Sequence, residues 1–268
     1  MKRVEWSGVG GVGALAVEWS VVEGERKKNF SVLKSQNLSG LLPPELVKLP
    51  FIQTIDLVRN YLSGTLPPEW GSTKLVTISV EGNRLYGQIP IEFANISTLG
   101  DFNLDSNYFS GPLPPELGSL PVLERVLLSS NYFNGTLPQT FANLNTLKNF
   151  QISDNNFTGK IPDFIGSWTQ LEKLCIQASG LEGPFPSGIF LLTGLTDMRL
   201  SDLKGSGAAL PPSSNLTSLN TLDLSFNNLI GKVPNSFSSL PRVEFLYLSG
   251  NFLTGDLPEG MLNRQKYM

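Results

Sequence analysis

The sequence predicts an α/β repeat solenoid, in which about ten short coils stack into one curved, right-handed rod. Two regularities predict it. Glycines recur every 24 residues, with one step of 23, and in all units but one a proline stands three positions later. Upstream of these glycines, apolar residues recur in the order L-x-x-L-x-L-x-x-N-x-L. The repeating glycines are Gly40, Gly64, Gly87, Gly111, Gly135, Gly159, Gly183, Gly207, Gly231 and Gly255.

Each coil is expected to begin with a short strand. The L-x-L segment alternates with period two, so its leucines point inward and the residues between them point outward. One such strand is too short to be stable alone, and stacked coils pair their strands into a parallel sheet. We expect this sheet on the concave face.

The asparagine of each unit is expected to turn the chain out of the strand. An inward amide both donates and accepts, so stacked asparagines can satisfy backbone groups in the turns. This predicted asparagine ladder comprises Asn60, Asn83, Asn107, Asn131, Asn155, Asn227 and Asn251. Gln36, Ser179 and Leu203 replace asparagine in units one, seven and eight. Because leucine cannot make these hydrogen bonds, unit eight should be the least regular coil.

The remaining part of each unit is the return leg on the convex side. Glycine permits the tight bend, and proline restricts the next residues to extended or single-turn, 3-10-like conformations. One further apolar anchor is expected there, such as Leu117, Phe141 or Phe237. The convex side should therefore be irregular, with 3-10 turns.

The repeat sets the domain boundaries at residues 32–262, with a non-repeat segment before it and a tail after it. Residues 1–31 break the register and are expected to be disordered, and residues 263–268 form the tail. Lys2, Arg3 and the small residues Ala14–Ala16 resemble a secretory leader, but Glu5 and several glycines interrupt its apolar region. The run Gly8–Gly13 matches G-x-G-x-x-G without the strand and helix that a dinucleotide site requires.

Composition argues against several function classes. The formal charge of −3 argues against a nucleic-acid partner. With no histidine and one cysteine, the chain offers no Ser-His-Asp or Cys-His machinery and no intrachain disulfide. No apolar run approaches the roughly 20 residues of a membrane-spanning helix. We expect a non-catalytic protein without cofactor or metal.

The outward positions of the strands are the predicted binding surface for a protein or peptide, because side chains vary there without disturbing the core. On units five to eight, Arg125, Lys148, Lys173 and Arg199 are expected to form a basic band. Aspartates flank it at Asp101 and Asp105, and at Asp197 and Asp223. The band suits a carboxylate-bearing ligand. The alternative is a solvated mixed-charge face in which Glu124 and Glu172 pair locally.

Exposed aromatics are the second candidate feature. Phe226, Phe245 and Tyr247 on units nine and ten could anchor a partner. A further coil or domain covering them is the alternative. The single cysteine, Cys175, also occupies an outward position and is expected to be an exposed free thiol.

Sequons for N-glycosylation favour a secreted ancestry. They occur at Asn29, Asn37, Asn95, Asn134, Asn156 and Asn215. We take Asn95, Asn134, Asn156 and Asn215 as the candidates. Asn134 and Asn156 fall at turns, where a glycan would be tolerated.

These motifs resemble the plant-type leucine-rich repeat, L-x-x-L-x-L-x-x-N-x-L-x-G-x-I-P, over about residues 32–262. Longer phrases, such as Leu66-Pro-Pro-Glu-Trp-Gly-Ser and Leu195-Thr-Asp-Met-Arg-Leu-Ser-Asp-Leu-Lys-Gly, are similar to one group. That group is the plant receptor-like serine/threonine kinases with a malectin-like domain. The resemblance implies a ligand-sensing ectodomain at the extracellular face of the plasma membrane, with a protein or peptide ligand and a co-receptor as candidate partners.

The chain departs from this family in having no cysteine-bearing cap and no kinase motif, so we interpret it as a receptor truncated to its repeats. Two alternatives stay open. One is a secreted leucine-rich-repeat inhibitor of cell-wall-degrading enzymes, which the missing cysteine-paired caps disfavour. The other is a non-functional partial gene product.

Overall fold

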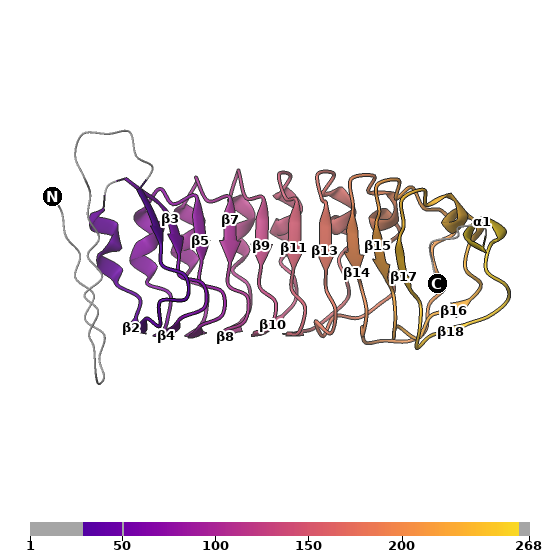
Figure 1. The fold of residues 1–268 in the computed structure, drawn as a ribbon, viewed down its shortest axis with the longest axis horizontal. Helices are drawn as coiled ribbons and strands as arrows, with labels where there is room; N and C mark the ends of the chain where they lie inside the picture. The colour runs from indigo at the N-terminus through magenta and orange to yellow at the C-terminus, as the bar shows by residue number, and fades with distance from the viewer. Residues whose placement is uncertain (1–28, 50, 263–268) are drawn as a thin grey trace.

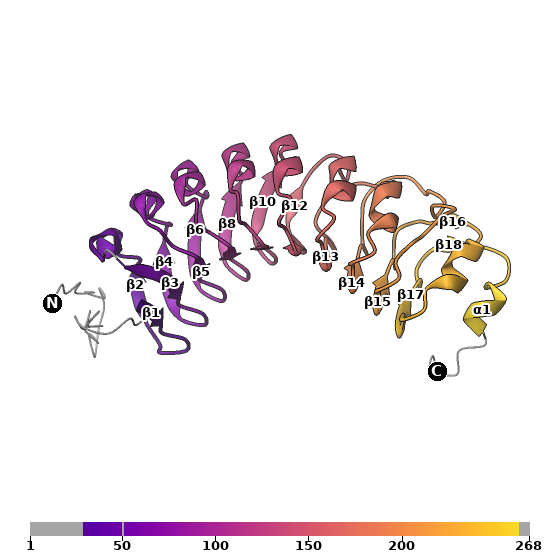
Figure 2. The ribbon, with the colours of Figure 1, turned by 90° about the horizontal axis from the view of Figure 1, so that it is seen from above.

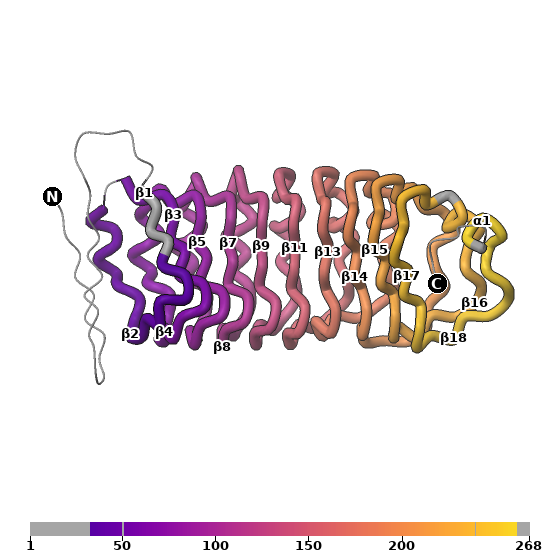
Figure 3. Tube along the Cα trace, viewed as in Figure 1, coloured from indigo at the N-terminus to yellow at the C-terminus, as the bar shows by residue number. Residues whose placement is uncertain are grey.

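The computed structural model describes residues 29–49 and 51–262. The coils stack side by side into an arch, with the described ends of the chain at opposite ends of it (Figure 1, Figure 2). The tube in Figure 3 traces the successive coils from β1 to β17. This is the predicted solenoid. The predicted leader-like region and glycine run of residues 1–28, and the tail at 263–268, lie outside the described residues.

The concave side of the arch is a parallel sheet of ten strands. Equivalent residues of neighbouring coils lie opposite each other, so that Asn149 pairs with both Arg125 and Lys173. The predicted register is thereby confirmed, although the first strand starts at Asn29 rather than at residue 32. The strands are β1 (Asn29–Val32), β3 (Ile52–Asp56), β5 (Thr77–Ser79), β7 (Asp101–Asn103), β9 (Arg125–Leu127), β11 (Asn149–Gln151), β13 (Lys173–Cys175), β14 (Asp197–Arg199), β15 (Thr221–Asp223) and β17 (Phe245–Tyr247).

A second parallel sheet, which the sequence analysis did not predict, runs along the flank where the chain leaves each asparagine. It has six strands over the first coils and a separate pair near the C-terminal end, along the lower edge of Figure 1. The strands are β2 (Ser39–Leu41), β4 (Tyr61–Gly64), β6 (Arg84–Gly87), β8 (Tyr108–Gly111), β10 (Tyr132–Gly135) and β12 (Asn156–Phe157), then β16 (Ile230–Gly231) and β18 (Phe252–Leu253).

Short 3-10 helices form the convex side, as Figure 2 shows on the outer rim of the arch. Each begins directly after a repeat proline, whose fixed φ suits the approach to a single turn. They are η1 (Pro44–Lys48), η2 (Pro68–Ser72), η3 (Ile91–Asn95), η4 (Pro115–Ser119), η5 (Gln139–Asn143), η6 (Asp163–Ser167), η7 (Ser187–Leu191) and η8 (Asn235–Ser239). A short α-helix, α1 (Glu259–Leu262), ends the described chain.

One continuous apolar core fills the space between the sheets and the convex turns. The predicted anchors Leu117, Phe141 and Phe237 are buried in it. Two tryptophans are also fully buried, and each satisfies its indole N–H with a backbone carbonyl one coil earlier. Trp70 donates to Pro43 O at 3.0 Å, and Trp168 donates to Phe141 O at 2.9 Å.

The asparagine ladder forms as predicted and links successive turns. Asn131 Oδ1 accepts the backbone N–H of Phe109, one coil earlier, at 3.0 Å. Its Nδ2 donates backward to Leu104 O at 3.0 Å and locally to Leu128 O at 3.2 Å. The same pattern recurs at Asn83, Asn107 and Asn155, with the hydrogen bonds crossing between coils.

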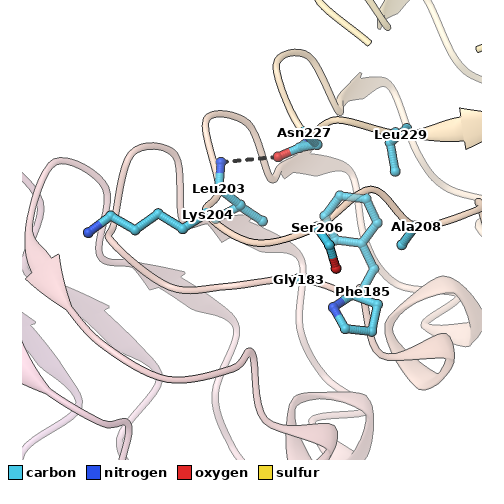
Figure 4. A pocket seen from close by; sticks show the side chains of 9 residues that line it. Gly183, Phe185, Leu203, Lys204, Ser206, Ala208, Asn227 and Leu229 are labelled. Atoms are coloured by element: carbon cyan, nitrogen blue, oxygen red, sulfur yellow. Dashed lines mark hydrogen bonds between the residues drawn. The ribbon is translucent and has the colours of Figure 1, made fainter. Parts of the chain in front are cut away.

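The eighth coil is the irregular one, as the substitution of Leu203 predicts. No 3-10 helix forms between η7 and η8 in the part of the chain that the structure describes, and the flanking sheet is interrupted there. An asparagine at position 203 would accept a hydrogen bond from the backbone N–H of Leu181. With leucine at that position, this N–H instead donates to Ser179 Oγ at a long 3.4 Å. Leu203 N–H donates to Asn227 Oδ1 at 3.1 Å (Figure 4).

Candidate partner-binding face

The outward positions of the concave sheet form columns across the ten strands, as predicted. The central column contains Asp56, Ser79, Asn103, Leu127, Gln151, Cys175, Arg199, Asp223 and Tyr247, each paired with the next. Their positions face outward from the strands, but exposure differs along the column. Ser79, Asn103, Leu127 and Cys175 are buried, whereas the others keep part of their surface accessible.

The four predicted cations lie on neighbouring coils, but each is ion-paired with an acidic side chain. Arg125 contacts Asp101 at 3.2 Å. Lys148 lies 2.9 Å from Glu124, and this hydrogen bond raises the pKa of the lysine. The predicted basic band therefore carries little unpaired positive charge in this region.

Asp197 is shared by the other two cations. Its carboxylate lies 3.4 Å from Lys173 Nζ and 2.9 Å from Arg199 Nε. The hydrogen bond from Arg199 to Asp197 raises the pKa of the arginine. The side chains of both cations stay about 40% exposed, at 38% and 43%. The Asp197 side chain is only 18% exposed, so a ligand carboxylate can approach both cations from the solvent while Asp197 stays in place.

The acidic side chains of coils three and four lie next to this mixed-charge region. Asp105 accepts Ser129 N–H at 2.6 Å, yet burial, together with nearby Glu81, raises the pKa of its carboxyl to about 6. Burial also raises the pKa of Asp101, although Arg125 opposes this. This stretch of the face is thus negative, and its carboxylates titrate closer to neutrality than free aspartate.

A polar network follows on the C-terminal side of the cations. Gln177 Nε2 donates to Ser201 Oγ at 3.0 Å and to Asp223 Oδ2 at 3.1 Å, which bridges three coils. Asp223 also accepts hydrogen bonds from the backbone N–H and the hydroxyl of Ser225. These residues are held in place before any ligand arrives.

The predicted aromatic residues lie exposed at the C-terminal end of the same face. Phe226, Phe245 and Tyr247 keep 56%, 50% and 49% of their surface accessible. Phe245 and Tyr247 belong to β17 and are paired with Thr221 and Asp223 of β15. The concave face therefore runs from a negative region, through ion pairs, to an apolar end.

The prediction for Cys175 is wrong, because its thiol is buried and not exposed. The residue does occupy an outward position of β13, but its short side chain lies between the longer Gln151 and Arg199 on the adjacent strands. Burial raises the pKa of the thiol to about 11. It is therefore a poor nucleophile.

Sequence reasoning missed the aromatic side chains on the flanking sheet. Tyr61, Tyr86, Tyr108 and Tyr132 are each about half exposed. Tyr108 and Tyr132 stack with ring centroids 6.3 Å apart. The dipeptide Asn-Tyr recurs at three ladder asparagines, and this pattern could have predicted Tyr61, Tyr108 and Tyr132.

The sequon asparagines Asn95, Asn134, Asn156 and Asn215 are exposed.

Among the described residues, no three acidic or cysteine side chains gather into a group that could hold a metal. The irregular eighth coil has a shallow pocket beside Phe185 and Leu203, shown in Figure 4, whose volume of about 10 Å³ is far too small for a cofactor. Within residues 29–49 and 51–262, no helix has the length and apolarity to cross a membrane.

Comparison with known proteins agrees with this geometry. Two leucine-rich-repeat family patterns match, one at residues 212–253 and the other at residues 122–144 and 146–168. The chain is a leucine-rich-repeat solenoid. Over 51 residues it is 57% identical to a probable leucine-rich repeat receptor-like serine/threonine-protein kinase of Arabidopsis thaliana, a match to 19% of this chain and 5% of that protein. The chain is thus homologous to plant leucine-rich-repeat receptor-like kinases over this stretch.

Solved leucine-rich-repeat structures extend the likeness to most of the chain. The plant peptide hormone receptor RGFR1 in complex with RGF2 matches with a TM-score of 0.83 and 31% identity, over 89% of this chain and 39% of that one. The Arabidopsis receptor kinase HAESA, solved with the peptide hormone IDA and the co-receptor SERK1, matches at 0.76 and 27% over 89% and 44%. A plant ice-binding protein matches at 0.72 and 26% over 84% and 72%. The chain thus spans less than half the length of either receptor ectodomain.

Proposed function

We propose that this leucine-rich-repeat solenoid is a ligand-recognition module that binds a protein or peptide along its concave face. The observation that carries the proposal is the graded concave surface, with its carboxylates, exposed ion pairs and exposed aromatics in register on adjacent strands. Its likeness to peptide hormone receptor ectodomains supports this function. The likeness to an ice-binding protein means that the solenoid alone does not determine the ligand.

The proposed ligand contacts are the concave-face residues that the sequence analysis named. The ion pairs indicate how the four cations among them would bind a ligand. Arg125, Lys148, Lys173 and Arg199 bind acidic groups of the ligand from the solvent side, in addition to their present carboxylate partners. A separate group, Phe226, Phe245 and Tyr247, anchors an apolar side chain. The ligand that suits this face is a peptide with acidic and apolar residues.

The homologous stretch supports a place in receptor-like kinase signalling, at the extracellular face of the plasma membrane and with a co-receptor. Membership of the subfamily with a malectin-like domain rests on the sequence phrases alone and belongs to the same proposal.

The test is selection of short random displayed peptides on the immobilised full chain, followed by calorimetry with the enriched peptides. The double substitution Arg125→Glu/Lys173→Glu and the single substitution Tyr247→Ala should each weaken binding about tenfold or more. The matched control Lys48→Glu/Lys74→Glu makes the same charge change at lysines of η1 and of the loop after η2, away from the concave face. Equal effects of the two charge reversals would contradict a concave site, as would a library that enriches nothing.

A further inference from the structure

The flanking sheet carries an ordered outer column of side chains, which we name the tyrosine column. It consists of the residues directly after four ladder asparagines: Tyr61, Arg84, Tyr108 and Tyr132. Two pairs of its members stack from coil to coil. The Arg84 guanidinium lies 5.0 Å from the ring centroid of Tyr61. The rings of Tyr108 and Tyr132 are 6.3 Å apart and only 15° from parallel.

A buried phenylalanine stack runs directly beneath this column and shows how it continues. Phe109, Phe133 and Phe157 stack with centroid distances of 6.2 Å and 6.4 Å and interplanar angles of 10° and 14°. Aromatic side chains 24 positions apart therefore stack from β8 through β12, although the Cα atoms that pair across these strands are 22 positions apart. The position that follows Tyr132 in the outer column is consequently Asn156 on β12, the neighbour of Phe157.

Asn156 has the chemistry of an unused glycan acceptor. Asn155, its predecessor, is buried and donates its amide to three carbonyl oxygens while its oxygen accepts Phe133 N–H. Asn156 is exposed, and its side chain makes no hydrogen bond with another described residue. Thr158, two residues on, is also exposed and completes the sequon.

The Tyr132 ring offers a surface for the attached sugar. The ring is 54% exposed, and among the described aromatic residues only Tyr108 stacks on it, from the side of β8. Its other face looks toward the coil that carries Asn156. Aromatic faces carry negative partial charge, and the C–H face of a pyranose presents positive partial charge to them.

We propose that Asn156 is N-glycosylated and that its first N-acetylglucosamine stacks on the open face of Tyr132, which extends the tyrosine column by one ring. The donor is a lipid-linked oligosaccharide diphosphate. A bond forms between Asn156 Nδ2 and sugar C1, the bond from C1 to the diphosphate oxygen breaks, and the diphosphate leaves with the electron pair. The amide proton passes to a base of the transferase. The modification rests on the proposed extracellular location, because it requires the secretory pathway.

The sequon at Asn95 provides a control on another side of the solenoid. Asn95 ends η3, is exposed and is followed by the exposed Ser97, which completes its sequon. Asn134 is not suitable, because it lies two residues after Tyr132 on β10 and both side chains point to the same side of the strand. A glycan on Asn95 should gain nothing from the tyrosine column.

The experiment uses the full chain, secreted from a eukaryotic host behind an added cleavable leader. All variants carry Thr136→Ala, so that no glycan on Asn134 competes for Tyr132. Glycopeptide mass spectrometry measures occupancy at Asn156 and Asn95. Thr158→Ala and Ser97→Ala then remove each sequon without touching its asparagine, in backgrounds carrying Tyr132, Tyr132→Phe or Tyr132→Ser. We expect Thr158→Ala to lower Tm by about 2–4 °C with Tyr132 or phenylalanine, and by less than about 1 °C with serine. Ser97→Ala should shift Tm equally in all three backgrounds.

A second measurement needs no ring variant. In the Thr136→Ala glycoprotein the acetamide methyl resonance of the sugar on Asn156 should move upfield through the ring current of Tyr132, while that on Asn95 stays at its usual position. The proposal is overturned if Asn156 is unoccupied, if its methyl resonance is unshifted, or if the Thr158→Ala effect is the same without the ring. None of these outcomes depends on a peptide binding at the concave face.

Discussion

Asn131→Ala is the sharpest test of how the asparagine ladder stabilises the solenoid. The substitution removes the acceptor of Phe109 N–H, whose 3.0 Å hydrogen bond lies in the interior. A buried donor left without a partner costs about 1–3 kcal/mol. The carbonyls that Asn131 also contacts keep other donors, since Leu104 O retains Asn107 and Leu128 O retains Asn155. With the loss of these secondary bonds and some packing, we expect destabilisation of about 2–3 kcal/mol.

The assay is urea unfolding of unglycosylated protein from bacteria, followed by far-UV circular dichroism and by the fluorescence of the buried Trp70 and Trp168. Asn134→Ala is the control in the same coil, because that side chain is exposed and makes no hydrogen bond with a described residue. It should change the free energy of unfolding by no more than about 0.5 kcal/mol. Equal costs for the two substitutions would show that the ladder hydrogen bonds do not hold the coils together.

Three further outcomes follow from burial and pKa. Cys175 should react with a disulfide reagent at pH 8 about 100-fold more slowly in the native protein than in urea, because a pKa of about 11 instead of 9.0 leaves that much less thiolate. Asp105 has a folded pKa of about 6, above its unfolded 3.8, so the native state binds the proton more tightly. Stability should therefore fall as pH rises from 4 to 6. Asp105→Asn should reduce this slope, to which Asp101 also contributes, and stabilise the protein at pH 7 by on the order of 1–2 kcal/mol in urea titrations. Phe133→Ala should cost about 3–5 kcal/mol in the same titrations, whereas Tyr132→Ala beside it should cost about 1 kcal/mol or less.

Most of the backbone could be predicted because the same pattern of residues recurs in almost every coil. The spacing of leucine, asparagine, glycine and proline determined the register, so the partners of Asn149 and the irregularity of the eighth coil at Leu203 could be derived directly. The flanking sheet was not predicted, because its strands are two to four residues long and show no alternation beyond what the glycine and asparagine positions impose.

The site was harder because spacing gives a side chain's direction and not its surroundings. Cys175 points outward as expected, yet its longer neighbours on both adjacent strands bury it. The ion pairs were within reach of sequence reasoning, since Asp101 and Arg125 occupy the same column one coil apart. Searching each column for adjacent opposite charges, rather than for bands of one sign, would have found them.

The different roles of the inward and outward positions explain why such a chain specifies its fold more strongly than its ligand. Buried apolar residues and ladder asparagines occupy the inward positions, and they fix the register. The concave ion pairs are exposed enough to contribute little to stability, so selection can alter Arg125 or Arg199 without unfolding the solenoid. The same scaffold can therefore appear in peptide hormone receptors and in an ice-binding protein. Recognition must be sought in the outward columns, and within them at the cations, whose side chains stay more accessible than the aspartates that pair with them.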